Sequence, residues 1–155
     1  MRKKTFAMVV SAAFGLASSA LAAEGGGSAI ELPEVCKAAA TADKQMMTDM
    51  QHGATEAMKD MSGHMTETQK DLSQAMTRMD SAMMRGMTAR DADLAFACSM
   101  LSHHQGAVDM ARVELARGDN PEAKAIARKT IDEQEKSIGE LRSWLQKDGR
   151  AEERH

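Results

Sequence analysis

The order of apolar and polar residues predicts a chain of helices and no strand. Apolar residues recur at intervals of three and four, which is the period of a helix with one buried face. The pattern predicts four helices: Pro33 to about Met61, Thr66 to Arg85, Thr88 to Arg117, and Asn120 to about Lys147. Because the connections are short, the expected fold is all-α, an antiparallel four-helix bundle.

Residues typical of helix ends set these limits. Thr88 to Asp91 resembles a capping box with Asp in the Glu position, which predicts that Thr88 opens the third helix. Gly118 is expected to cap the end of that helix. Asn120 followed by Pro121 predicts the N-cap and first turn of the fourth.

The first residues have the layout of an export signal. A basic start at Arg2, Lys3 and Lys4 precedes an apolar stretch, and the small residues Ala20 and Ala22 stand where a signal peptidase cuts. We therefore expect a signal peptide at 1–22, cleaved after Ala22, with no membrane insertion of the mature chain. Cleavage takes the formal net charge from −3 to −6, because three basic residues are removed.

The mature chain is expected to have four parts. They are a flexible lead at 23–32, a Met-rich N-terminal helix at 33–65, a helical core domain at 66–148 and a disordered tail at 149–155.

Composition narrows the function classes. Aromatic residues make up 3% of the chain and tyrosine is absent, which argues against carbohydrate sites and nucleic-acid platforms because both rely on stacked rings. A net charge of −3 offers no electrostatic attraction for nucleic acid. Methionine is the departure from ordinary usage, with 15 residues in 155.

Most methionines fall in the first two predicted helices. Between Lys44 and Met87 the only large apolar residue other than methionine is Leu72. At about 100° per residue, the second predicted helix gathers four methionines into one stripe: Met76, Met79, Met83 and Met87. The first carries a second set on one side, with His52 projecting elsewhere: Met46, Met50, Met61, His64 and the adjoining Met65.

Three interpretations of these methionines stay open. A methionine stripe at helical spacing is usually part of a core, because Met fills gaps well. A Met-lined surface also suits adaptable binding of apolar clients. The third interpretation is metal binding, since thioethers are soft neutral donors that suit Cu(I) and, by the same softness, Ag(I). Methionine in place of Leu over two helices favours metal binding, because Leu, Ile and Val specify a core better.

A histidine pair in the third predicted helix joins this pattern. His103 and His104 follow Met100 by three and four residues, so either ring can meet its sulfur. Met110 shares a face with His103 two turns on. Adjacent residues point about 100° apart, so we expect one histidine to bind an ion while the other serves a second helix or donates a hydrogen bond. Two partly buried histidines paired with carbonyls or acids are the alternative.

The two cysteines of the chain, Cys36 and Cys98, are expected to form one disulfide after export. Closing a loop of about sixty residues contributes roughly 4 kcal/mol in the chain-entropy account. A thiolate metal site is the alternative. It is less favoured because Cys98 and Met100 point to opposite sides of the predicted helix.

The third predicted helix also carries a family resemblance. The segments DADLAF from Asp91 and MLSHHQGAVDMA from Met100 resemble the motif of the bacterial domain of unknown function 305 family. The resemblance covers about Met76 to Leu145, and its closing helix is matched by Ile131, Gln134, Ile138, Trp144 and Leu145.

The resemblance implies a ferritin-like helical bundle. The copper-tolerance member of the family, CopM, implies periplasmic binding of copper and silver through Met and His. Asp80 departs from the family pattern, which often has His there. Ser137 and Leu141 replace a Glu and a Met, so the resemblance assigns no ligand to the fourth helix. The matched ligand candidates are Met100, His103, His104 and Met110, with Met76, Met79 and Met83 matching the preceding Met-rich helix.

Catalysis is not expected. Di-iron sites in ferritin-like bundles need Glu-x-x-His pairs, and none of the four predicted helices has one. We therefore predict an exported, non-enzymatic protein that binds Cu(I), and Ag(I) by extension, for copper tolerance or trafficking. A copper efflux or oxidase partner and a homo-oligomer stay open. The alternative is a periplasmic stress chaperone, because Met65 to Gln69 resembles the L-T-x-x-Q motif of the Spy and CpxP proteins.

Overall fold

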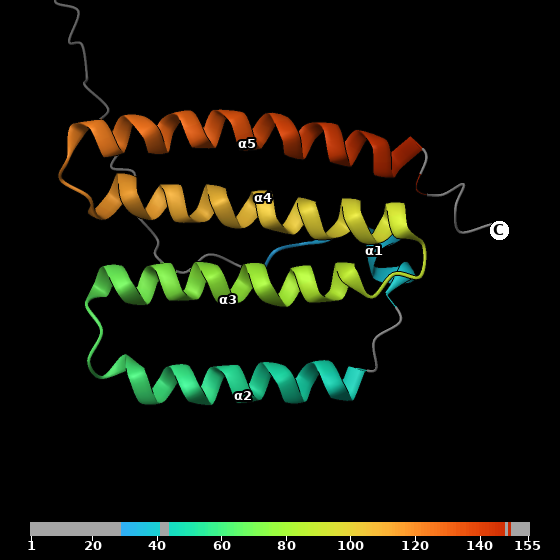
Figure 1. Ribbon diagram of the computed structural model, residues 1–155, viewed down its shortest axis with the longest axis horizontal. Coiled ribbons are helices and arrows are strands. Elements are labelled where there is room, and N and C mark those ends of the chain that lie inside the picture. The colour runs from blue at the N-terminus through green and yellow to red at the C-terminus, as the bar shows by residue number, and fades with distance from the viewer. Residues whose placement is uncertain (1–28, 41–43, 148, 150–155) are drawn as a thin grey trace, which may run out of the picture.

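The computed structural model describes residues 29–40, 44–147 and 149, and these residues are predominantly helical (Figure 1). The helices are α1 (Glu34–Ala39), α2 (Lys44–Ser62), α3 (Glu67–Met87), α4 (Ala92–Arg117) and α5 (Pro121–Lys147). The all-α prediction is confirmed. The signal peptide, most of the lead and all of the tail except Gly149 lie outside the described residues.

The four long helices lie in a row in chain order, with neighbours antiparallel (Figure 1). α4 is the central element, because it packs along its length against α3 on one side and α5 on the other. α2 contacts α3 more sparsely. Within the described residues, no helix is both long and apolar enough to cross a membrane.

The single helix expected from Pro33 to Met61 is wrong, because the structure divides this stretch into α1 and α2. Ala40, directly after α1, is extended and pairs with Ala89 in an isolated antiparallel bridge. An extended residue cannot continue a helix, so tertiary pairing overrides the helical preference of this alanine-rich segment. The lead also packs at its end, since Ile30 and Leu32 are buried.

The caps agree with the sequence pattern except at α4. Asn120 Oδ1 accepts hydrogen bonds from the backbone N–H of Glu122 and Ala123, as predicted. The N-cap of α4 is Asp91, whose carboxylate accepts from Leu94 N–H at 2.8 Å. Thr88 instead ends α3, so the prediction that Thr88 opens the helix is wrong. Asp is favoured over Thr as the N-cap here because a carboxylate also interacts favourably with the positive end of the helix dipole.

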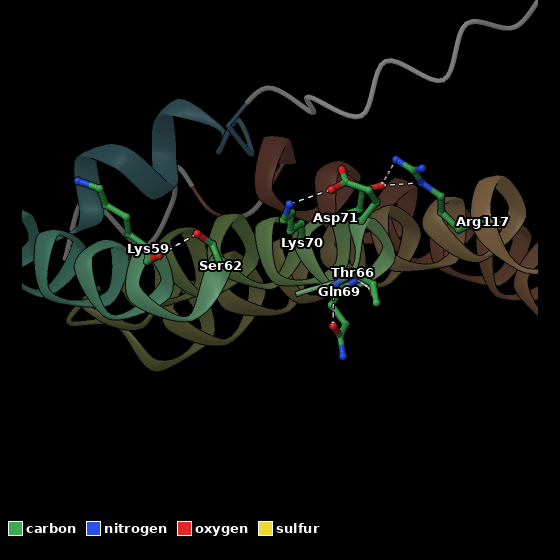
Figure 2. A network of polar contacts seen from close by, with 8 residues as sticks. Lys59, Ser62, Thr66, Gln69, Lys70, Asp71 and Arg117 are labelled. Atoms are coloured by element: carbon green, nitrogen blue, oxygen red, sulfur yellow. Dashed lines mark hydrogen bonds and ion pairs between the residues drawn. The ribbon is translucent and has the colours of Figure 1, made fainter. Parts of the chain in front are cut away.

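α3 begins with a reciprocal capping box. Thr66 Oγ1 accepts from Gln69 N–H at 3.2 Å, and Gln69 Oε1 accepts from Thr66 N–H at 2.8 Å (Figure 2). These are the Thr and Gln of the chaperone-like motif, so helix capping accounts for their spacing. Next to them, Asp71 holds Arg117 of α4 through contacts of 2.8 and 2.9 Å (Figure 2). This pair ties the start of α3 to the end of α4.

The core lies where α1, α4 and α5 meet. Its buried cluster is Leu32, Cys36, Leu94, Ala97, Cys98, Leu101, Val108, Ile138 and Leu145. Cys36 and Cys98 form a disulfide within it, both fully buried, with Cα atoms 5.7 Å apart. The predicted disulfide is therefore confirmed, and the thiolate metal site is excluded because neither sulfur is free.

Candidate metal-binding face

Methionine does not form the core of this protein. Of the methionines whose side chains the structure describes, none is buried. Met76 and Met87 are 48% and 54% exposed, while Met79 and Met83 are half-buried. The stripe predicted on α3 therefore lies at the border of the packed interior, where its sulfur atoms are within reach of a bound species.

Small residues occupy the contact between α3 and α4 instead. Ala75, Ala82 and Gly86 are the buried residues of α3, and Gly106 is buried on α4. A Cβ added to Gly106 would lie 2.5 Å from the Met79 sulfur, so Met79 rests directly on the backbone of α4. Apart from Met79, which packs on Gly106, the methionines of the stripe lie along the flank of this contact.

The flank that carries the methionines is opposite α1. Cys98 marks the α1 side of α4 through the disulfide, and His103 points about 140° away from it around the helix. On α3, Arg78 marks the same side as Cys98 through its ion pair with Asp109, and Met83 points about 140° from Arg78. We call this flank the methionine face; its residues are Met76, Met79, Met83 and Met87 of α3, and Phe96, Met100, His103 and Met110 of α4.

The register of α3 against α4 places two thioethers and an imidazole at similar heights along the helices. Gly106 is level with Met79, and the Ser99 hydroxyl reaches the Met83 carbonyl at 3.5 Å. His103 lies between Ser99 and Gly106, so it is level with the turn that separates Met79 from Met83. In the same antiparallel register, Met110 is level with Met76.

The structure separates the two histidines. Their ring centroids are 5.9 Å apart and the rings are inclined by 73°. His103 is exposed on the methionine face. His104 is half-buried and turns toward α5, with Met100 one turn before it. Of the two histidines, only His103 therefore lies on the methionine face.

The second predicted cluster is only partly described. α2 ends at Ser62, so His64 and Met65 lie in the connection to α3, and the expectation that they share a helix face with Met50 is wrong. Gly63 directly follows the last helical residue, which is a usual position for glycine after a helix. Met50 is 50% exposed, while the side chains of Met46 and Met61 lie outside the described residues.

The described part of the chain holds no cluster of the usual metal-binding side chains. No three His, Cys, Asp or Glu side chains there come close enough together to hold a metal ion. Methionine, whose sulfur is a soft donor, is not among these four residue types.

The sequence patterns did not identify three further residues as candidate site residues. Phe96 is 63% exposed on the methionine face, Gly106 seats Met79, and Gln134 of α5 has a buried, unpartnered oxygen. His104 on α4 and Gln134 on α5 each belong to a series of residues spaced by seven. This spacing is the sequence signal that could have indicated that both face the contact between α4 and α5.

Comparison with known protein families identifies one family that matches the chain. The sequence profile described as Domain of unknown function (DUF305) matches residues 13–145, which is most of the chain. Among curated proteins, none matches the chain significantly.

Proposed function

The chain belongs to the DUF305 family, and from that premise we propose that it binds Cu(I), and Ag(I) by the same soft chemistry, for copper tolerance or trafficking. The observation that carries the proposal is the position of the methionines, none of which is buried among those described. A protein that used methionine only to fill its interior would bury it, because the thioether gains stability from packing.

Met79, Met83 and His103 are the proposed central donors. Two thioethers and an imidazole are ligands that Cu(I) accepts readily, and the register of α3 and α4 supports their proximity. Met76 and Met110 extend the set at the next level, and Met87 and Met100 flank it. The metal is cargo here rather than a resident cofactor, and we propose no catalytic activity.

Export and assembly complete the proposal. We propose that residues 1–22 direct export to the periplasm and are removed after Ala22, which the buried disulfide supports because such bonds persist in oxidising compartments. We also propose that the helices belong to an antiparallel four-helix bundle of the ferritin-like type. A copper efflux or oxidase protein would be the partner, and neither nucleic acid nor a membrane is proposed as one.

Native mass spectrometry of residues 23–155, titrated with Cu(I) without oxygen or thiol reductants, tests the proposal. We expect discrete Cu(I) adducts that survive a competing Cu(I) chelator, and Ag(I) adducts of the same number. A folded protein that retains neither ion would refute the proposal.

Leucine variants locate the site. Met79→Leu with Met83→Leu conserves volume, so the fold should persist while a tightly held ion is lost. Met84→Leu is the matched control, because Met84 is half-buried on the same helix but points about 140° from Met79. Equal Cu(I) binding by both variants would show that Met79 and Met83 are not ligands.

A chaperone activity is the second candidate. It is supported by the exposed apolar residues Phe96 and Ile126, which are 63% and 62% exposed. Phe96→Ser should weaken suppression of client aggregation by metal-free protein if this activity exists. The same change should leave Cu(I) stoichiometry intact, because a phenyl ring is no ligand.

A further inference from the structure

One histidine of α4 and one glutamine of α5 each have a buried polar atom without a hydrogen-bond partner. Among the described residues, His104 Nδ1 and Gln134 Oε1 are both buried and both lack a hydrogen-bond partner. Buried polar atoms are normally paired, because an unpaired one gives up its bonds to water without replacement. The two belong to complementary types, since a protonated Nδ1 donates and an amide oxygen accepts.

The register of the helical hairpin places these residues opposite each other. His104 lies 13 residues before Arg117, the last residue of α4, and Gln134 lies 13 residues after Pro121, the first residue of α5. Antiparallel helices joined by a short turn bring residues at equal distances from the turn to the same level.

The neighbouring layers of the seam follow the same rule. Along α4, Ala97, His104 and Ala111 recur every seven residues, and along α5 so do Ala127, Gln134 and Leu141. Ala111 and Ala127 are both buried, as expected for residues that face each other near the turn. The register therefore places His104 and Gln134 at one level of the seam, next to the level of Ala111 and Ala127.

We propose that these two atoms, which are unpaired in this structure, pair with each other in solution: Gln134 Oε1 accepts a hydrogen bond from His104 Nδ1–H. This bond would preset His104 as a metal donor through Nε2. Nε2 is not among the buried, unpartnered atoms of the described residues, so it is the nitrogen left to meet a ligand. Histidines that bind metals commonly donate their other ring N–H to an oxygen, which fixes both the tautomer and the ring orientation. Gln134 acts here as a positioning residue, and its metal role rests on the proposed function.

The same geometry gives the two histidines different roles. His103 is exposed on the methionine face, whereas His104, in the proposed pair, is held by α5 and offers its outer nitrogen on the side of Met100. Gln134 thus links the closing helix to metal binding although α5 supplies no sulfur or imidazole at this level.

Nuclear magnetic resonance of the imidazole nitrogens tests the pair without any metal. In metal-free protein at a pH where histidine is neutral, we expect His104 to carry its proton on Nδ1. Gln134→Leu should shift it toward the Nε2–H form, and Gln134→Glu should keep the Nδ1–H form because a carboxylate accepts the same bond. Gln146→Leu is the matched control, since Gln146 is an exposed glutamine on the same helix. A wild-type proton on Nε2, or no change in Gln134→Leu, overturns the pair.

Ag(I), which is diamagnetic, tests the metal half in the same spectra. We expect Ag(I) to shift His104 Nε2, and its affinity for that nitrogen to fall about 10–100-fold in Gln134→Leu. Ag(I) bound with no effect on His104 would overturn the metal role of Gln134 while sparing the hydrogen bond. Failure to bind any Ag(I) would instead count against the proposed function, and the metal-free spectra would still decide the pair.

Discussion

At the scale of single residues, glycine and alanine decide where the sulfur atoms lie. Large apolar side chains ordinarily take the interior, so Met79 and Met83 would be expected inside and Ala75, Ala82 and Gly86 outside. The structure has the opposite order on α3, because small residues let two helices approach closely over a long contact. The methionines are left along the flank.

Gly86 gives the sharpest test of that close approach. A Cβ at Gly86 would lie 2.8 Å from the carbonyl carbon of Cys98, a backbone atom that cannot turn aside. We expect Gly86→Ala to lower the free energy of unfolding by about 1–3 kcal/mol, measured by urea denaturation. Gly139→Ala is the control: it has open space around it and should gain up to about 1 kcal/mol from helix propensity. Equal gains in both variants would mean that α3 and α4 are not in close contact.

The sequence could predict the stripe but not its environment. Helical spacing alone places Met76, Met79, Met83 and Met87 on one side of α3. Whether that side is core or surface depends on which neighbouring helix arrives and how closely, and spacing within one helix carries no such information. The proposed pairing of His104 with Gln134 could not be read from either helix for the same reason, because it depends on the register between α4 and α5.

At the scale of elements, a helix began where the sequence predicted it when a single capping residue was favoured. Pro121 suits the first turn of a helix, which favours Asn120 over the neighbouring Asp119 as the cap, and α5 begins as predicted. At α4 two candidates compete, and Asp91 takes the cap while Thr88 closes α3. The break between α1 and α2 has no local signal, since Ala38, Ala39 and Ala40 all favour helix.

The cap of α4 is open to a direct test. We expect Asp91→Ala to cost about 1 kcal/mol of stability, because Leu94 N–H would lose its acceptor, while Asp91→Asn should preserve most of it. Thermal unfolding followed by circular dichroism at neutral pH measures both. A larger loss from Thr88→Ala than from Asp91→Ala would show that the helix begins at Thr88 after all.

At the scale of the whole molecule, the disulfide and the proposed metal donors lie on opposite faces. The disulfide, α1 and the buried ends of the lead lie on one side of the α3–α4 pair. The methionine face lies on the other, about 140° around α4 from Cys98 to His103. The disulfide could be predicted from the cysteine count, while export, which the sequence start indicates, stays a prediction. The separation of the two faces required the packing of α3 against α4.

This separation predicts that stability and metal binding can be uncoupled. The disulfide joins residues 62 apart in the sequence, and its removal by Cys36→Ala with Cys98→Ala should cost roughly 4 kcal/mol by the chain-entropy account. Because α1 packs away from Met79, Met83 and His103, we expect the folded double variant to retain the Cu(I) stoichiometry of the parent protein.

Urea denaturation and native mass spectrometry of the same samples measure the two quantities, at a temperature where the double variant stays folded. A proportional loss of Cu(I) in a variant that remains folded would mean that the sulfur-bearing flank depends on α1, and that the two faces act as one unit. Retention of Cu(I) with a lowered midpoint would mean that α3 and α4 hold the donor geometry by themselves, through the seam of small residues on which Met79 rests.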